Sequence, residues 1–288
     1  MSGSPRRVLL TGASGLLGSA VAPLLRSIPG IEVEAPGMAQ FDLTLPETIE
    51  AALERARPDV VLHLAAETRV DWCEEHAEEA FRVNTAGTAL VARAAEARGA
   101  RLVFVSTDYV FDGAARSPYS EDHATRALNV YGRSKEEAEK AVASTAGDRL
   151  IVRSSGLYGA GGKNFVDTIR AKAHRGERLA VVDDQVQSPT WVGDLAPALV
   201  RAALSGAQGI LHLASDGGGC SWFDFAREIL AQIGSRIACD PIPASRAGRP
   251  APRPAYSVLD VSRARDTLSI RMPHWRDGLT RYLSGGER

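Results

Sequence analysis

Short, continuous runs of apolar residues alternate with segments of helical periodicity along the first half of the chain. The apolar runs are too short for helices, and they have no polar alternation, which is typical of strands buried on both faces. Strands of this kind require helices on both sides of the sheet. The pattern therefore predicts an α/β fold with a doubly wound, Rossmann-like parallel sheet, with strands at 7–10, 31–35, 60–64, 102–105 and 150–153.

Two of the predicted helices carry specific local signals. We expect a first helix that follows the first strand and its turn and runs to about Arg26. Further helices are expected over 44–57, 74–98 and 131–143. Pro23 should kink or end the first helix early, because proline removes a backbone donor and its ring clashes with the preceding turn. Thr44 and Glu47 have the spacing of a capping box, which predicts that the second helix opens there.

A glycine-rich turn joins the first strand to the first helix. Gly12, Gly15 and Gly18 have the spacing G-x-x-G-x-x-G, and a strand before them and a helix after them are the context that a dinucleotide-binding loop requires. Gly12 and Gly15 would let the backbone approach a pyrophosphate, and Gly18 would let the helix pack closely. The helix N-terminus at Leu16 and Leu17 would offer free N–H groups. We therefore predict a dinucleotide cofactor.

The residues that would choose between NAD and NADP give no answer. An acid at the end of the second strand holds the adenosine ribose, and an arginine there accepts a 2′-phosphate; residues 35–37 are Ala-Pro-Gly and contain neither. Asp42, with Leu43, either lies against the adenine or closes a turn. Ala65 and Ala66 are small and would let a nucleotide lie against the end of the third strand. Both NADPH and NADH remain open.

Polar residues follow the fourth strand and open the fourth helix. Tyr131 and Lys135 are four residues apart, so they lie one turn above each other on the same helix face. A cation at that distance would stabilise a phenolate and make the phenol a better proton shuttle. Residues 107–109, Thr-Asp-Tyr, fall at the carboxyl edge of the sheet, where open α/β sheets bind ligands. Asn84 is polar in an apolar stretch, either as a satisfied helix residue or as a cap at a break.

Composition excludes several classes of function. The 288 residues are 44% hydrophobic with a formal net charge of −1, which gives no electrostatic case for nucleic acid or an anionic membrane surface. No run of 18 apolar residues occurs, and the three cysteines are far apart, so neither disulfides nor a zinc site is indicated. A soluble cytoplasmic protein is expected. Three histidines are expected to be packing or surface residues, namely His63, His123 and His274.

Beyond residue 155 the regular alternation loosens into loops, shorter helices and a Pro/Arg-rich segment over 242–254. We expect a dinucleotide-binding domain over 1–155 and a mostly substrate-binding lobe over 156–288. Segments around 185–215 are expected to return to the sheet. An apolar face on the middle helices would allow a homodimer.

As a set, these motifs resemble the extended short-chain dehydrogenase/reductase superfamily and, within it, the dTDP-4-dehydrorhamnose reductases. The resemblance spans nearly the whole chain. It rests on the three glycines, Leu64 to Ala66, Ser106 to Gly113, Leu128 to Lys135, Asp184-Gln185 before Ser188 to Thr190, Arg253-Pro254 ahead of Ser257 to Leu259, and Met272 to Arg276.

The resemblance implies NADPH- or NADH-dependent reduction of the 4-keto group of a nucleotide-linked deoxysugar, dTDP-4-dehydro-L-rhamnose to dTDP-L-rhamnose. Thr107 would hydrogen-bond the carbonyl oxygen, Tyr131 would supply the proton, and Lys135 would hold the nicotinamide ribose and lower the pKa of Tyr131. Asn84 would lie near the cofactor. The sugar would lie near Val70, Asp71, Asp108, Tyr109 and Gly156. The related 4,6-dehydratases carry an acid at the position of Tyr109, so dehydration is disfavoured.

Three positions depart from the family pattern. Gly156 stands where a pocket Trp is usual, and Gln187 stands at a position that is typically Gly. Ala20 replaces a Glu that holds magnesium in some members, so no metal is carried over. The changed pocket leaves open a reductase of another keto-sugar or of a secondary metabolite. A third alternative is a non-catalytic, cofactor-binding regulatory subunit that resembles the beta subunit of methionine adenosyltransferase.

Overall fold

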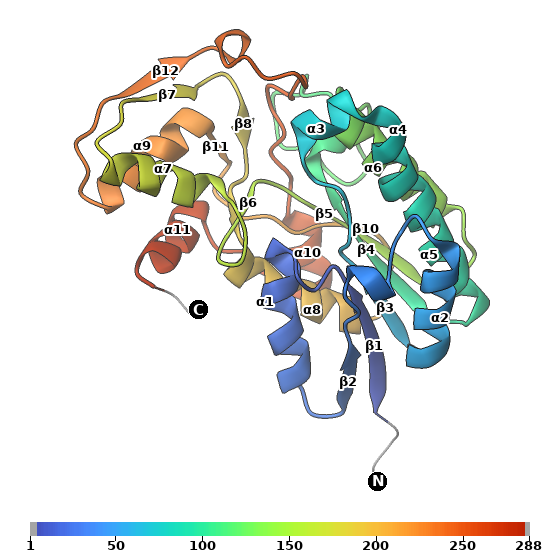
Figure 1. Ribbon diagram of the computed structural model, residues 1–288. Helices are drawn as coiled ribbons and strands as arrows, with labels where there is room; N and C mark the ends of the chain where they lie inside the picture. The colour runs from blue at the N-terminus through green and yellow to red at the C-terminus, as the bar shows by residue number, and fades with distance from the viewer. Residues whose placement is uncertain (1–4, 286–288) are drawn as a thin grey trace.

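The centre of the molecule is a six-stranded parallel sheet with the strand order β10-β5-β4-β3-β1-β2. We describe residues 5–285 of a computed structural model (Figure 1). Every pairing in the sheet is parallel, as the continuous apolar runs predict. The strands are β1 (Arg6–Thr11), β2 (Ile31–Glu34), β3 (Val60–His63), β4 (Arg101–Thr107), β5 (Arg149–Ser154) and β10 (Gly209–His212).

Helices cover both faces of this sheet (Figure 1). Successive strand residues point to opposite faces, so Val8 and Leu10 join one core whereas Leu9 joins the other. The first core lies under α1 (Leu16–Ser27), α8 (Val192–Leu204) and α10 (Ser262–Leu268). The second lies under α2 (Pro46–Ala56), α5 (Thr88–Ala97) and α6 (Val130–Ala143). The predicted doubly wound architecture is confirmed.

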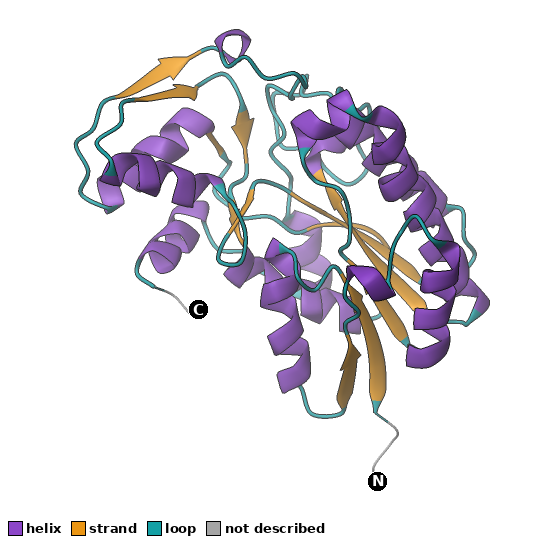
Figure 2. Cartoon of the chain, in the orientation of Figure 1, coloured by secondary structure: helices purple, strands orange, loops and turns teal. Residues whose placement is uncertain are grey.

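A smaller lobe has its own core and lies beyond the carboxyl ends of the strands (Figure 2). The core packs α7 (Phe165–His174), α9 (Trp222–Gln232) and α11 (Trp275–Leu283) against the parallel pair β7 (Leu179–Val182) and β12 (Cys239–Ile242). Two further pairs join β8 (Val186–Gln187) to β11 (Cys220–Ser221) and β6 (Leu157–Tyr158) to β9 (Thr190–Trp191). From the same half of the chain, β10 and α8 return to the main sheet and its helix layer; the domain boundary at residue 155 stays a prediction.

The first helix does not end early at Pro23. It continues to Ser27 with the proline inside it. Pro23 is exposed, so the carbonyl of Ser19 that loses its helical donor can be solvated, while Val21 and Leu25 are buried on the opposite side. Burial of the apolar face therefore outweighs the local effect of the proline, and the early end was a wrong prediction.

The predicted capping box is also wrong. Helix α2 begins at Pro46, and the N-cap is Leu45, which provides no side-chain hydrogen bond. The hydroxyl of Thr44 instead donates to Asp42 Oδ1 at 2.7 Å. Proline suits the first helical position because its missing N–H would have no partner there. The N-cap is therefore Leu45, one residue later than the Thr44 that the capping-box spacing suggests.

The segment 74–98 is not one uninterrupted helix. It is divided into α3 (Val70–Glu75), α4 (Ala77–Phe81), a π-helical segment labelled η2 (Arg82–Gly87) and α5. Gly87 lies so close to Leu43 that an added Cβ would be 2.7 Å from the Leu43 backbone oxygen. This tertiary contact and the hydrogen bonds of Asn84 fall within the π-helical segment. The remaining short helices are η1 (Met38–Gln40), η3 (Asp108–Val110) and η4 (Ala244–Arg246).

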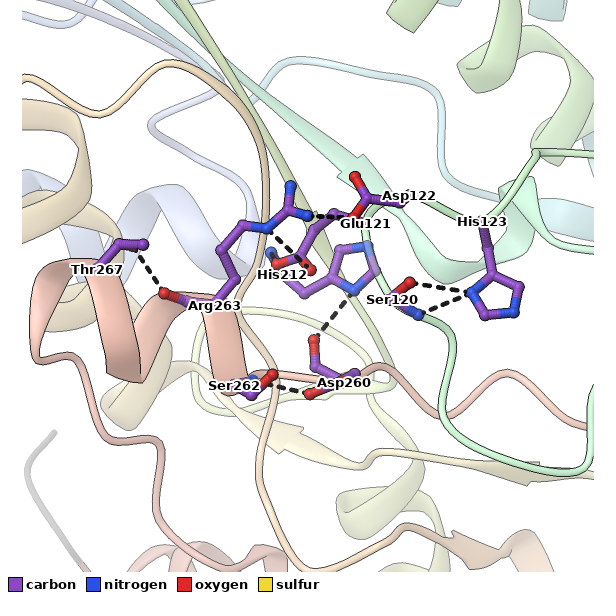
Figure 3. A network of polar contacts seen from close by, with 9 residues as sticks. All are labelled: Ser120, Glu121, Asp122, His123, His212, Asp260, Ser262, Arg263 and Thr267. Atoms are coloured by element: carbon purple, nitrogen blue, oxygen red, sulfur yellow. Dashed lines mark hydrogen bonds and ion pairs between the residues drawn. The ribbon is translucent and has the colours of Figure 1, made fainter.

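A buried polar network ties β10 to the 120–123 segment and α10 (Figure 3). Glu121 Oε1 accepts the backbone N–H of His212 at 3.0 Å, and the Glu121 carboxylate lies 3.5 Å from Nε of Arg263. His212 Nδ1 donates to the carbonyl oxygen of Asp260 at 3.2 Å. Over residues 5–285, no helix is long and apolar enough to cross a bilayer.

Two fully buried histidines should make the fold sensitive to acid. Burial lowers the pKa of His63 and of His212 to about 3. Below the ordinary histidine pKa of about 6.5 the unfolded chain binds protons that the native protein does not, so stability is lost as the pH falls. We expect His212→Gln to reduce the loss between pH 6.5 and 4.5 by on the order of 2 kcal/mol, measured by urea unfolding. Replacement of the exposed His123 is the control; an equal effect there would contradict the assignment.

Candidate active site

The turn between β1 and α1 forms a cradle that only glycine permits at two positions. Gly12 has φ +71°, and a Cβ on it would lie 2.7 Å from the backbone nitrogen of Ala65. A Cβ on Gly18 would lie 2.1 Å from the carbonyl oxygen of Gly12. No side chain caps the first turn of α1, so the N–H groups at Leu16 and Leu17 have no capping partner. The cradle therefore fits the pyrophosphate of a dinucleotide, as the glycine spacing predicts.

The residues predicted to meet the adenine half of a cofactor flank this turn. Asp42 Oδ1 accepts the backbone N–H of Thr44 at 2.8 Å and its hydroxyl at 2.7 Å, and these bonds hold the pKa of the carboxyl below its usual range. Asp42 thus closes a turn, while the Leu43 side chain is buried in the sheet core. An adenine contact by either residue stays a prediction.

The end of β3 is locked to the glycine turn. Thr11 Oγ1 accepts the backbone N–H groups of Leu64 and Ala65 at 3.2 and 3.3 Å, and it lies 2.7 Å from Nδ1 of His63. His63 is thus a packing residue, as expected. Ala65 and Ala66 are half-buried beside the cradle.

Asn84 is fully buried, and its side chain is hydrogen-bonded to Glu67 and Ser134. Its Oδ1 accepts the backbone N–H of Glu67 at 2.8 Å, while Nδ2 donates to the Glu67 carbonyl and to Ser134 Oγ, both at 3.0 Å. Asn84 therefore joins the loop after β3 to the helix that carries Lys135. It is the satisfied helix residue of the first alternative, and its predicted proximity to a cofactor is untested.

Tyr131 lies in the first turn of α6, directly beside the end of β4. Asn129 caps this helix by accepting the Gly132 N–H at 2.7 Å. A Cβ on Gly132 would lie 2.2 Å from the carbonyl oxygen of Tyr109, so glycine permits this close approach. The rings of Tyr109 and Tyr131 meet edge to face with centroids 6.0 Å apart. The fold thereby brings Tyr131 to the Thr107–Tyr109 segment, as the sequence predicts.

The pKa of Tyr131 moves opposite to the expected direction. Burial raises it well above the ordinary phenol value, and the neighbouring Thr107 side chain opposes the rise only in part. Lys135 Nζ donates to the Val105 carbonyl at 2.8 Å and lies 4.0 Å from the centroid of the Phe104 ring. Burial sets the direction of the shift in this structure, and a lowering of the Tyr131 pKa by Lys135 stays a prediction. The phenol therefore carries its proton at neutral pH, which is the protonation state that a proton donor needs.

Lys135 is itself strongly perturbed. Its side chain is buried, and desolvation lowers its pKa to about 7, partly opposed by the charge of Glu139 one turn later. A buried lysine with one carbonyl partner keeps two ammonium protons for other acceptors. Ribose hydroxyls are acceptors of this kind.

Asp71 and Arg253 form an ion pair, and Arg253 neighbours Tyr109. The two guanidinium nitrogens donate to the carboxylate oxygens of Asp71 at 3.0 and 2.8 Å, and this pairing holds the pKa of Asp71 below its usual range. Val70 precedes Asp71 at the start of α3 and is half-buried. The carboxylate is thus engaged by the Pro/Arg-rich segment, and contact of either residue with a sugar stays a prediction.

The two departures at Gly156 and Gln187 are complementary in space. Gly156 has φ +58°, and an added Cβ would lie 2.0 Å from Gln187 Oε1. Gln187 is buried, with only 5% of its surface exposed. The carboxamide therefore occupies the space that a side chain on residue 156 would need.

This pairing predicts an asymmetric response to substitution. Gly156→Ala should destabilise the protein by about 2 kcal/mol, because a non-glycine residue at positive φ costs about 1–2 kcal/mol and the methyl meets Gln187. In a Gln187→Gly background, Gly156→Ala should cost only the free energy of placing a non-glycine residue at positive φ. Urea unfolding of both variants and the double variant measures the coupling; strictly additive losses would contradict it.

Some residues of the site could not be assigned a role from the sequence. Arg253 pairs with Asp71 across 182 residues, and Ser257 donates to Asp108 across 149 residues. Ser155 also donates to Asp108, and Gln187 covers Gly156. Arg253 and Ser257 lie in motifs that carry the family resemblance, but no local sequence pattern indicated which side chains they contact.

Comparison with known proteins places this arrangement in a family. The family described as RmlD substrate binding domain matches residues 6–287. A dTDP-4-dehydrorhamnose reductase from Streptomyces griseus is 43% identical, with 97% of this chain and 94% of that protein covered. A dTDP-4-keto-6-deoxy-D-glucose reductase from Streptomyces niveus is 36% identical, with 95% of each covered.

A solved structure shares both fold and sequence. The dTDP-4-dehydrorhamnose reductase from Bacillus anthracis, crystallised in complex with NADP, superposes with a TM-score of 0.91 at 32% identity, covering 97% of this chain and 99% of that one. The sheet, the glycine cradle and the Tyr131–Lys135 helix thus belong to a shared architecture. This chain is a member of the dTDP-4-dehydrorhamnose reductase family.

Proposed function

We propose that this protein is an NADPH- or NADH-dependent oxidoreductase that reduces the 4-keto group of a nucleotide-linked deoxysugar, with dTDP-4-dehydro-L-rhamnose as substrate and dTDP-L-rhamnose as product. The observation that carries the proposal is the grouping of three residues at the end of β4: the Thr107 side chain lies against Tyr131, and Lys135 Nζ donates to the β4 carbonyl of Val105 at 2.8 Å. The names of the S. griseus and B. anthracis relatives support the substrate.

The cradle and α1 would hold the dinucleotide by its pyrophosphate, and Lys135 would bind its nicotinamide ribose. When bound, the nicotinamide supplies the hydride that reduces the carbonyl carbon. The NADP complex of the B. anthracis relative supports the cofactor class. Glu34 is the last residue of β2 and pairs with Arg55, so an acid and an arginine both lie at this strand end. The choice between NADPH and NADH is left to experiment.

The side chains would act on the carbonyl oxygen. Negative charge develops there as the carbon is reduced, and a fixed hydroxyl donor such as Thr107 stabilises it. Tyr131 would give its proton to this oxygen, which completes the alcohol and leaves a phenolate that the solvent reprotonates. Asp71, Asp108, Tyr109, Val70 and Gly156 would surround the sugar.

A second keto-sugar substrate is favoured by one specific observation. Gln187 places a carboxamide where the family pattern typically has glycine, and it occupies the space that a Cβ on Gly156 would need. The S. niveus relative is named for a different dTDP-linked 4-keto sugar at similar identity. Comparing kcat/KM for the two dTDP-4-keto sugars decides between these alternatives.

The test of the proposed function follows NAD(P)H absorbance at 340 nm with the purified protein and dTDP-4-dehydro-L-rhamnose generated in situ. Prompt oxidation is expected, and the ratio of rates with NADPH and NADH gives the cofactor preference. Tight cofactor binding without turnover of either keto-sugar, together with co-purification of a partner enzyme, would instead favour the regulatory-subunit alternative. The cytoplasmic location, the homodimer and the lack of nucleic-acid binding stay predictions of the sequence.

A further inference from the structure

Asp108 is a buried carboxyl surrounded by three hydroxyl groups. Its residue exposure is 2%. Oδ2 accepts the hydroxyl of Ser257 at 2.5 Å and that of Ser155 at 2.9 Å, while Oδ1 accepts the hydroxyl of Thr107 at 3.1 Å. The two serines thus share one oxygen, and the threonine has the other. The serine bonds lie within the usual O–H···O range, whereas the threonine bond is longer than that range and therefore weak.

The two serines come from parts of the chain far from Asp108. Ser155 directly follows β5, the neighbour of β4 in the sheet. Ser257 lies in a segment fixed to β8 by backbone bonds: its N–H donates to the Val186 carbonyl, and the Val186 N–H donates to the Ala255 carbonyl, both at 2.8 Å. Both serines are buried. A residue that follows a strand of the main sheet and a residue bonded to β8 therefore donate to the same carboxylate oxygen.

The Thr107 hydroxyl has one hydrogen, and two acceptors compete for it: Asp108 Oδ1 and the proposed substrate carbonyl. The hydroxyl oxygen of Thr107 accepts the Tyr109 N–H at 3.2 Å. A substrate carbonyl oxygen can only accept, so Thr107 can bind it only by donating this hydrogen. Asp108 competes for that hydrogen through Oδ1. Two strong donors on Oδ2 draw charge away from Oδ1 and weaken its hold on Thr107.

We propose that Ser155 and Ser257 are positioning residues, which satisfy Asp108 and thereby leave the Thr107 hydroxyl free to turn toward the carbonyl oxygen of the substrate. This inference rests on the proposed function for the role of Thr107. The serines touch neither substrate nor cofactor; they act through Asp108. Each serine hydroxyl opposes the rise that burial causes in the pKa of Asp108, which stands at about 6.

The kinetic test combines Ser257→Ala with Thr107→Val at pH 8. Ser257→Ala alone should lower kcat roughly 10- to 100-fold, the size expected for a misdirected catalytic group, with KM for NADPH unchanged. In the Thr107→Val background the same change should have little further effect, because the hydroxyl it frees is gone. Ser215→Ala is the matched control, since Ser215 is also buried and its hydroxyl has no hydrogen-bond partner among residues 5–285. Losses that multiply in the double variant would overturn the proposal.

A second readout needs no substrate. Carbon-13 NMR of the Asp108 carboxyl should show its titration moved to higher pH in Ser257→Ala and in Ser155→Ala, and unmoved in Ser215→Ala. An unchanged Asp108 titration would overturn the positioning role even in a fully active enzyme. If the wild type reduces no keto-sugar, the proposed function fails, while a shifted titration still supports the serine contacts. Ser155→Ala serves as the test variant if Ser257→Ala does not fold.

Discussion

Tyr131→Phe should lower kcat by roughly 10²- to 10⁴-fold, the usual contribution of a positioned general acid. The ring stays, so its edge-to-face contact with Tyr109 is kept. Only the proton donor is lost. Because burial raises the pKa of Tyr131, the wild-type phenol holds its proton throughout the neutral range, and kcat should not fall from its ionisation below pH 9.

The measurement is steady-state NADPH oxidation with the keto-sugar, accompanied by a fluorescence titration of NADPH binding. The binding constant should change little. Tyr282→Phe is the matched control, because it removes a tyrosine hydroxyl in the smaller lobe on α11, where the hydroxyl donates to Asp167 Oδ2 at 2.8 Å. Full turnover by Tyr131→Phe would show that another group donates the proton.

Glu139→Ala should destabilise the fold by about 3–5 kcal/mol, the usual cost of removing one partner of a buried ion pair. Nε of Arg153 lies 2.9 Å from Glu139 Oε1 and a terminal nitrogen lies 2.6 Å from Oε2, and both side chains are buried. The guanidinium also lies 5.1 Å from the centroid of the Phe111 ring. Without Glu139 its charge would have no counter-ion in this contact.

Urea unfolding measures this loss. Glu139→Leu combined with Arg153→Met should recover most of it, because an apolar pair of similar size leaves no buried charge. Glu137→Ala, which breaks the exposed 2.8 Å pair with Lys140, should cost less than about 1 kcal/mol. A loss in Glu139→Ala no larger than in Glu137→Ala would contradict the importance of the buried pair.

The sheet could be predicted because its information is local. Runs such as 60–64 and 102–105 are apolar without alternation, and that pattern identifies a strand covered on both faces. Helix boundaries depended on contacts that the local sequence does not contain. The π-helical segment within 74–98 contains Gly87, which approaches Leu43, and the Thr44 hydroxyl that a capping box would use donates to Asp42 instead.

The same distinction applies to the site. Tyr131 and Lys135 could be paired because helix geometry fixes their spacing, and Thr107 could be placed because it ends a strand. The contacts of the Lys135 ammonium could not be predicted, because its partners Val105 and Phe104 lie 30 and 31 positions earlier in the chain. The contacts of Ser257 with Asp108 and of Gln187 with Gly156 likewise arise only from the tertiary fold.

The central claim is hydride transfer to the C4 carbonyl carbon of a nucleotide-linked sugar, and deuterium labelling tests it most directly. The protein is incubated with dTDP-4-dehydro-L-rhamnose and NADPH deuterated at the transferring position of the nicotinamide, and the product is analysed by mass spectrometry and proton NMR. We predict a sugar nucleotide one mass unit heavier than the unlabelled product, with deuterium only at C4. Recovery of unreduced keto-sugar, or of deuterium at another carbon, would contradict the account.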